Sequence, residues 1–212
     1  MEDKNLAKRV LDVAYKNRLC HLGTYFSSLE IIDQIYKKIQ KDGDKDIFIL
    51  SPGHASVALY AVLEKYYGIS ADFLFDKHGW HPYRDEENRI YCSTGSLGTG
   101  LTVAVGRAVA NPKRKVYCLI SDGECSEGAI WEALAFIQQN NLKNIEIHCN
   151  MNGYSAYDTV NKEYLIERLK AFLPSITIHE TDVNAFTFLC GLNAHYYIMT
   201  AEDYEMAKDK LS

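Results

Sequence analysis

Short apolar runs alternate with longer amphipathic stretches along the whole chain. The apolar runs have the length of strands buried on both faces, and they cover residues 47–50, 116–120, 145–149, 176–179 and 196–199. Helical patterns separate or follow them, at residues 55–67, 101–110, 130–139, 164–173, 183–190 and 202–210. Two more helices precede the first strand: one carries Leu6, Val10 and Val13, and the other starts at a capping-box pattern over residues 27–30. The alternation predicts an α/β fold, a parallel sheet of about five strands with helices on both faces.

The length and composition fit one globular domain that spans residues 1–212. Hydrophobic residues make up 47% of the chain and charged residues 24%, and 212 residues can bury a core without disulfides or metals. The formal charge of −5 gives no positive field for nucleic acid. The six cysteines form no C-x-x-C pair, and no apolar run resembles a signal peptide or a membrane span. We therefore expect a cytoplasmic protein with reduced thiols that binds neither nucleic acid nor a membrane.

Polar residues and glycines follow two of the predicted strands where each strand ends. Asp122 and Gly123 come just after the strand at 116–120, and Asn152 and Tyr154 come just after the strand at 145–149. Because neighbouring parallel strands end at the same edge of a sheet, we expect Asp122 and Asn152 to lie side by side. With the Tyr154 carbonyl they would give a divalent cation three oxygen ligands, and Gly123 would let a phosphate approach closely. Taken singly, each Asp-Gly or Asn-Gly pair is better explained as a turn.

Five short motifs occur in order over residues 5–160. They are Cys20-His21-Leu22-Gly23, the run Phe-Ile-Leu-Ser-Pro-Gly-His at 48–54, His81-Pro82, the glycine-rich run at 95–100, and Asp122-Gly123-Glu124 followed by Glu127-Gly128 and Trp131-Glu132. With Asn152 at the expected distance after Asp122, this order resembles the N-terminal, diphosphate-binding domain of the transketolase family. Leu22 stands where that family has Pro, and Ser121 stands where it has Gly, which is typical of a divergent branch.

The resemblance implies thiamine diphosphate as the cofactor, with Mg²⁺ or Ca²⁺ held by Asp122, Asn152 and the Tyr154 carbonyl. The implied cofactor contacts are His54, Gly95, Ser96, Leu97, Asp122, Gly123, Glu124 and Asn152. The implied catalytic set is His21, His54 and His81, which would line the substrate channel and move protons, and Glu127 and Glu132, which match acidic residues that link cofactor sites across a dimer interface. The plainer explanations are a packing role for a histidine at a helix start and two exposed carboxylates favoured by a helix dipole.

The implied activity is transfer of a two-carbon ketol unit from a ketose to an aldose. In the family, a second domain supplies the Glu that protonates the aminopyrimidine and the Arg and His residues that grip phosphate. None of these has a match in this sequence, and neither has a later substrate-contacting His. We therefore expect the N-terminal subunit of a split transketolase, a transferase subunit inactive alone, which acts on a sugar or sugar phosphate. A separate pyrimidine-binding subunit would complete the site, in a homodimer or a heterotetramer.

Three other functions stay open at this point. The chain could be a subunit of another thiamine diphosphate enzyme, of the 2-oxo acid or deoxyxylulose-phosphate type, or an inactive regulatory domain that binds a cofactor or partner. A nucleotide-binding module is less favoured, because no strand precedes the Gly98-x-Gly100 pattern. We interpret His148, His179 and His195 as structural. We prefer His81 to His78 for the channel, because Pro82 and the spacing favour it.

Overall fold

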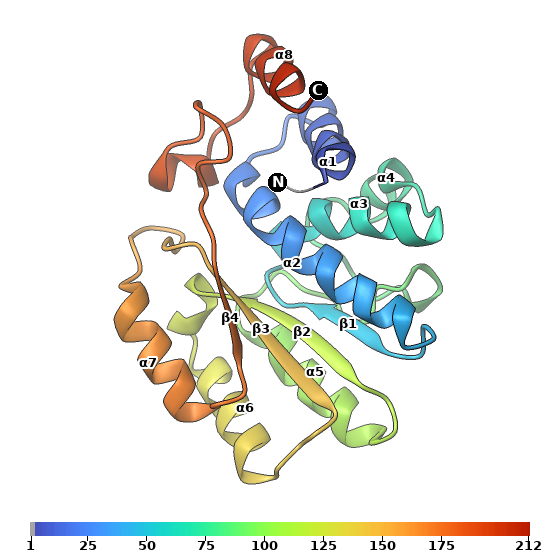
Figure 1. Cartoon of the computed structure of the whole chain (residues 1–212), viewed down its shortest axis with the longest axis vertical. Coiled ribbons are helices and arrows are strands. Elements are labelled where there is room, and N and C mark those ends of the chain that lie inside the picture. The colour runs from blue at the N-terminus through green and yellow to red at the C-terminus, as the bar shows by residue number, and fades with distance from the viewer. Residues whose placement is uncertain (1–2) are drawn as a thin grey trace.

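The computed structural model describes residues 3–212 and is built on a parallel sheet with the strand order β1-β2-β3-β4 (Figure 1). The strands are β1 (Ile47–Leu50), β2 (Val116–Ser121), β3 (Ile145–Met151) and β4 (Thr177–Glu180). All neighbouring strands were expected to be parallel, and they are. The α/β class is confirmed, but the sheet has four strands in the described chain rather than about five. Residues 196–199 form no strand, although they are apolar.

Alternate side chains of β1 and β2 enter two separate cores. In β1, Ile47 and Ile49 point to one side of the sheet, and Phe48 and Leu50 point to the other. The same two-residue period divides β2, where Tyr117 and Leu119 join the core of Phe48. Every residue of β1 and β2 is buried, which explains why these strands are continuous apolar runs rather than alternating ones.

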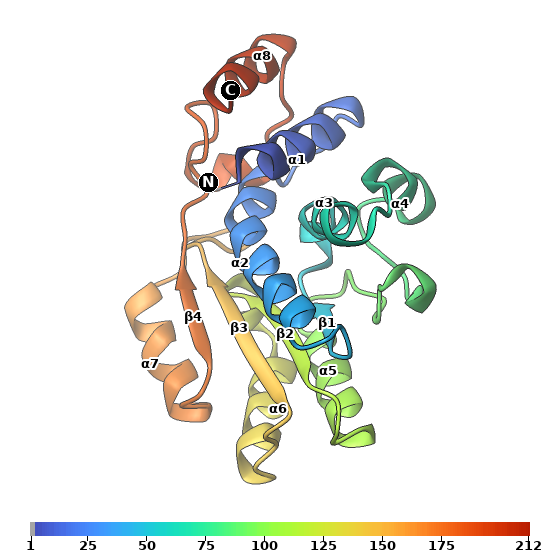
Figure 2. The same cartoon turned by 45° about the vertical axis from the view of Figure 1, so that its right-hand side comes forward.

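Helices cover both faces of this sheet, as the two views show (Figures 1 and 2). On one face α2 (Leu22–Lys41) lies against the sheet, and α1 (Lys4–Lys16) and α3 (Ser56–Tyr67) pack on α2, with α4 (Ala71–His78) beside α3 and α8 (Ala201–Lys210) beside α1. The other face carries α5 (Thr99–Ala110), α6 (Gly128–Gln139) and α7 (Lys162–Phe172). Over residues 3–212, we find no helix with both the length and the apolar character that a membrane crossing requires.

Three local predictions were wrong or incomplete. Helix α2 begins at Leu22 instead of at the capping-box pattern, so Ser27 and Ser28 lie inside the helix and accept hydrogen bonds from Nδ2 of Asn150 at 2.9 and 3.0 Å. Residues 183–190 form no helix, although their apolar side chains enter the core. Helix α4 was not predicted, because its eight residues give too short a pattern.

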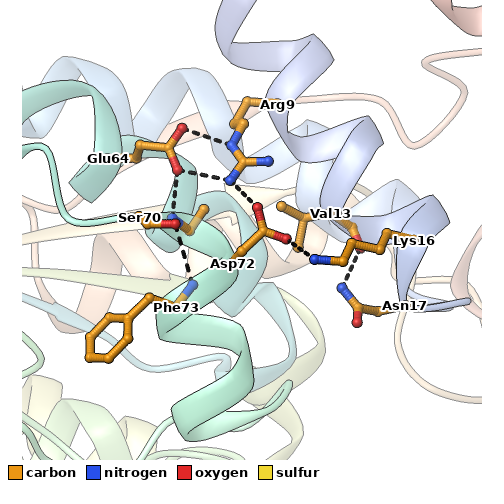
Figure 3. Close-up of polar contacts among 9 residues, drawn as sticks. Arg9, Val13, Lys16, Asn17, Glu64, Ser70, Asp72 and Phe73 are labelled. Atoms are coloured by element: carbon orange, nitrogen blue, oxygen red, sulfur yellow. Dashed lines mark hydrogen bonds and ion pairs between the residues drawn. The ribbon is translucent and has the colours of Figure 1, made fainter.

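A polar cluster joins α1 to α3 and α4 (Figure 3). Nε of Arg9 donates to Glu64 at 2.7 Å, and Nη2 of Arg9 and Nζ of Lys16 donate to Asp72 at 2.5 and 2.7 Å. Glu64 also accepts from the Ala71 amide at 2.6 Å, at the start of α4. We call these residues, Arg9, Lys16, Glu64 and Asp72, the Arg9 cluster. Each carboxylate in it is matched by a cation, so the cluster holds three helices together.

Candidate functional site

The carboxyl ends of β2 and β3 bring Asp122 and Asn152 together, as the strand order requires. Ser121 pairs with Asn150 in the sheet, and the Gly153 amide donates to Oδ2 of Asp122 at 2.6 Å. The Gly123 amide donates to the other oxygen, Oδ1, at 3.0 Å. Oδ1 of Asn152 accepts from the Tyr154 amide at 2.9 Å. The two turns thus hold both side chains in fixed positions at one edge of the sheet.

The Asp122 carboxylate is buried without a cationic side chain to neutralise it. Its residue is 2% exposed, and burial raises its pKa to about 6, against the lowering effect of the Gly153 and Gly123 amides. The charge of Lys162 also lowers the pKa of Asp122, but this lysine is not hydrogen-bonded to the carboxylate. Its Nζ donates to the Thr181 carbonyl at 3.1 Å. A buried carboxylate that ionises near neutral pH and has no cationic partner is suited to a bound metal ion.

Asp122 and Asn152 open onto a cavity of about 240 Å³ at this edge of the sheet. Its wall combines the strand ends, the start of α2 and the segment before α5. The lining residues are His21, Gly23, Thr24, His54, His81, Gly95, Leu97, Ser121, Asp122, Gly123, Asn152, Tyr154, Ser155, Ala156, Val183, Gly191 and His195. None of them is Lys or Arg, so this wall carries little positive charge.

Three predicted histidines, His21, His54 and His81, line this cavity. The rings of His21 and His54 have centroids 5.3 Å apart. Burial is the main cause that lowers the pKa of His21 to about 4 and that of His54 to about 3. Both rings are therefore uncharged at neutral pH and can donate or accept a hydrogen bond. Nδ1 of His21 is buried and has no hydrogen-bond partner in the described chain.

His195, which we interpreted as structural, is a fourth histidine that lines the cavity. It belongs to the short helix η4 (Gly191–His195), and its ring centroid lies 4.2 Å from that of His21 and 5.6 Å from that of His54. A backbone hydrogen bond joins the two segments: the His21 amide donates to the His195 carbonyl at 2.8 Å. His21 has a left-handed backbone, with φ of 66°, and both histidines line the cavity although they are far apart in sequence.

The other histidines lie outside the cavity. Nδ1 of His148 and Nε2 of His179 are 2.8 Å apart, and Nε2 of His148 is 2.9 Å from Glu146. This arrangement joins β3 to β4 and agrees with the structural interpretation of both. Nε2 of His78 lies 3.1 Å from Asp85, in the loop that follows α4. His78 therefore points to that loop, whereas His81 lines the cavity.

The glycine-rich segment before α5 enters the site through only part of its length. Gly95 and Leu97 line the cavity, whereas the Ser96 side chain is exposed and is not part of the wall. The buried Glu124 anchors this segment: it accepts from the Gly98 amide at 2.8 Å and from Oγ of Ser51 at 2.7 Å. In the described chain Glu124 therefore positions the loop from behind instead of facing the cavity.

Glu127 and Glu132 are exposed and lie outside the cavity. Glu127 precedes α6, and its Cβ would be 2.8 Å from a Cβ built on Gly98. Glu127 thus lies beside the glycine-rich segment, and Glu132 is exposed on α6. A role for them in linking cofactor sites requires a second polypeptide and stays a prediction.

At Gly123 and Gly95 the neighbouring residues leave little space for a larger side chain, so bare backbone borders the cavity, which suits a closely approaching diphosphate. A Cβ on Gly123 would lie 3.3 Å from Cα of Ser155 and 3.5 Å from the Tyr154 carbonyl oxygen, and a Cβ on Gly95 would lie 3.3 Å from the His81 ring. Carboxylate, amide and carbonyl oxygens are the donors that Mg²⁺ and Ca²⁺ prefer. Within residues 3–212 there is no group of three or more His, Cys, Asp and Glu side chains with metal-binding geometry, so the oxygen set is the one to consider.

Known proteins share the sequence pattern described above. The family described as transketolase, thiamine diphosphate binding domain, matches residues 5–172. A protein of Actinobacillus succinogenes, named as one subunit of an apulose-4-phosphate transketolase, is 35% identical over 186 residues, which cover 77% of this chain and 66% of that protein. The 6-deoxy-6-sulfo-D-fructose transketolase subunit SqwG of a Clostridium strain is 30% identical over 203 residues, which cover 84% of this chain and 73% of that protein.

A solved structure shows the same fold. Transketolase from Leishmania mexicana superimposes with a TM-score of 0.77 and 20% identity, over 98% of this chain and 40% of that one. The chain therefore spans about two thirds of its Actinobacillus succinogenes relative and less than half of the solved enzyme.

Proposed function

Because the chain belongs to the transketolase family, through its thiamine diphosphate-binding domain, we propose that it is the diphosphate- and metal-binding subunit of a thiamine diphosphate-dependent transketolase. The observation that carries the proposal is the buried Asp122 carboxylate, which has no cationic partner and lies beside Asn152 in a histidine-lined cavity. The activity proposed is transfer of a two-carbon ketol unit from a ketose to an aldose.

The oxygens at the strand ends would hold the metal, and the glycines would admit the diphosphate. Asp122, Asn152 and the Tyr154 carbonyl are the proposed ligands of Mg²⁺ or Ca²⁺. Backbone amides already hold the side chains of Asp122 and Asn152 in position. Gly123 and the backbone of residues 95–97 are the proposed diphosphate contacts. When bound, thiamine diphosphate supplies the nucleophilic carbon that cleaves the ketose and carries the two-carbon unit.

The histidines of this chain would act on the sugar. His21, His54 and His195 are held uncharged by burial, which lowers the pKa of each, so they would donate and accept hydrogen bonds at sugar hydroxyls and not act as fixed positive charges. His81 lies beside Gly95 at the exposed side of the cavity. Neutral imidazoles can accept a proton from one group and donate it to another. Ketol transfer requires such proton transfers at the sugar hydroxyls around the reacting carbons.

A second, pyrimidine-binding subunit completes the proposed site. The names of the relatives support this, because two of them are called subunits of a transketolase. The surface of α5 and α6 supports an interface with another polypeptide on that side. It carries the exposed Glu127 and Glu132 and three exposed apolar residues, Val103, Val109 and Phe136. The assembly would be a homodimer or hold two copies of each subunit. A cytoplasmic location is part of the proposal, supported by six free cysteines.

The proposal is tested by assaying ketol transfer with the purified chain alone and with a candidate pyrimidine-binding subunit, both with thiamine diphosphate and Mg²⁺. We expect no turnover from either polypeptide by itself and turnover from the mixture. Full activity of this chain alone would contradict the two-subunit arrangement. Turnover of 2-oxo acids but not of sugars by the mixture would instead assign the chain to another class of thiamine diphosphate enzyme.

A further inference from the structure

The segment Gly79-Trp80-His81 places a tryptophan at the edge of the cavity. Two buried residues of α3 hold this segment: Oγ of Ser56 donates to the Trp80 carbonyl at 2.8 Å, and the Tyr60 hydroxyl donates to the Gly79 carbonyl at 3.0 Å. The peptide groups before and after the Trp80 Cα are therefore both held by hydrogen bonds, although Trp80 lies in a long irregular segment.

The indole continues a row of aromatic rings that begins inside the cavity. Its centroid is 6.0 Å from that of His21 and 6.2 Å from that of His81, and the Trp80 and His81 rings are inclined by only 26°. His21 in turn lies 4.2 Å from His195. The Trp80 residue is 46% exposed, so a large aromatic surface faces water where the row leaves the cavity.

The charge of the cavity wall limits what can lie against this surface. No lining residue is Lys or Arg, and burial lowers the pKa of His21, His54 and His195, which keeps them uncharged at neutral pH. The part of the wall nearest Trp80 is formed by His21 and, behind it, His195, so a phosphate or carboxylate has no fixed cationic partner there, in contrast to the strand ends, where the proposed metal ion would hold the diphosphate. An uncharged carbon chain with hydroxyls suits it better, because its C–H groups can lie on the electron-rich indole face while its hydroxyls reach the imidazoles.

We propose that Trp80 is a specificity-determining residue that stacks on the uncharged, hydroxylated carbon chain of a ketose. The inference rests on the proposed function and deepens it, since it assigns which part of the substrate this chain recognises. Any charged end of the sugar is then directed away from Trp80. The stacking surface belongs to this chain alone and needs no second subunit.

Fluorescence tests the inference, because the chain has only two tryptophans, Trp80 and Trp131. The protein is loaded with thiamine diphosphate and Mg²⁺ and titrated with D-xylulose, an uncharged ketose, and separately with inorganic phosphate. We expect a saturable change in emission with D-xylulose and none with phosphate. The change should persist in the matched control Trp131→Phe, whose indole contacts Phe172 and Arg168, and should vanish in Trp80→Phe.

Sugar affinity is measured in parallel by saturation-transfer NMR, which does not depend on tryptophan. Loss of one aromatic stacking partner is expected to weaken binding about fivefold in Trp80→Gly, and Trp80→Phe should restore most of it. Unchanged affinity in Trp80→Gly, no D-xylulose binding to the loaded wild type, or a response to phosphate equal to that for the sugar would each overturn the inference. All three leave the proposed function standing if cofactor binding is intact, whereas loss of cofactor binding itself counts against the proposed function.

Discussion

Asp72 and Asp122 are both carboxylates at the start of a helical turn, but they differ in what balances their charge. Asp72 lies in the Arg9 cluster, where Lys16 and Arg9 lower its pKa (Figure 3). Asp122 lies at the cavity, where burial raises its pKa to about 6 and only backbone amides donate to it. The Arg9 cluster is electrostatically complete within the chain. The Asp122 site has no such partner within the described chain, and in our proposal a bound metal ion supplies the missing cation.

This difference separates a stabilising site from a binding site. A carboxylate matched by half-buried cations contributes to folding, because its charge is favourable where it stands. A carboxylate buried without a cation costs free energy in the unliganded chain, and binding of a metal ion recovers that cost. Substitutions in the two places should therefore affect different measurements: cofactor binding at Asp122 and stability in the Arg9 cluster.

The largest effect is expected for Asp122→Asn. The amide keeps the shape of the side chain but removes the negative charge, so Mg²⁺-dependent binding of thiamine diphosphate should weaken by roughly 100-fold or more, about 2.7 kcal/mol. The melting temperature of the unliganded chain should fall little or rise. Calorimetric titration and thermal unfolding measure the two quantities, with the exposed Asp158→Asn as the matched control. Unchanged metal dependence would remove Asp122 from the metal site.

The opposite pattern is expected for Arg9→Met. Methionine keeps the apolar stem but leaves Glu64 and Asp72 facing each other without Arg9, which should lower the free energy of unfolding by about 2 kcal/mol. Cofactor affinity should stay within about twofold, because Arg9 does not line the cavity. Denaturant unfolding measures the first quantity, and Lys4→Met on the same helix is the control. A variant as stable as wild type would show that the cluster contributes nothing measurable.

The pH dependence of unfolding should have opposite signs at the two sites. The pKa of Asp122 is raised on folding, so its contribution favours the folded chain below about pH 4 and is lost as the pH rises through about 6. The pKa values of Asp72 and Glu64 are lowered, so their contribution is present above the unfolded values and is lost as the pH falls. Comparing wild type with Asp122→Asn from pH 4 to 7 isolates the first contribution. A difference that grows in favour of wild type with rising pH would contradict it.

The smallest effect is expected for Ser70→Ala beside the Arg9 cluster. Oγ of Ser70 caps α4 by accepting from the Phe73 amide at the long distance of 3.4 Å, so its loss should cost only about 0.5 kcal/mol. Cofactor affinity should not change. Denaturant unfolding checks the value, and a loss above that of Arg9→Met would mean that the cap, and not the ion pairs, holds α4.

The sheet could be predicted from the sequence because its strands are buried on both faces. Such strands are continuous apolar runs bounded by turns; β1 and β2 have that pattern, whereas β3 includes Glu146 and His148 and β4 is only half-buried. The run at 196–199 has it too, but the chain after β4 turns toward α1 and α8 instead of adding a strand. Local pattern cannot tell an apolar strand from an apolar segment that packs irregularly.

The site could be predicted where sheet topology alone brings residues together. Asp122 and Asn152 follow neighbouring parallel strands, so their proximity needs only the strand order. The position of His195 could not be predicted, because it depends on a tertiary contact, the backbone hydrogen bond between His195 and His21. No motif around His195 signals this contact. Trp80 was passed over for the same reason, since its closeness to His21 depends on how the segment before α5 is anchored to α3.

The most direct test of the account is a calorimetric titration of thiamine diphosphate into the purified chain, once with Mg²⁺ and once with EDTA. If Asp122 and Asn152 form a metal site for the diphosphate, binding will be saturable with Mg²⁺, absent with EDTA, and progressively weaker as the pH falls below the Asp122 pKa of about 6. Binding of equal strength with EDTA, or none with Mg²⁺ even when a pyrimidine-binding subunit is present, would contradict it.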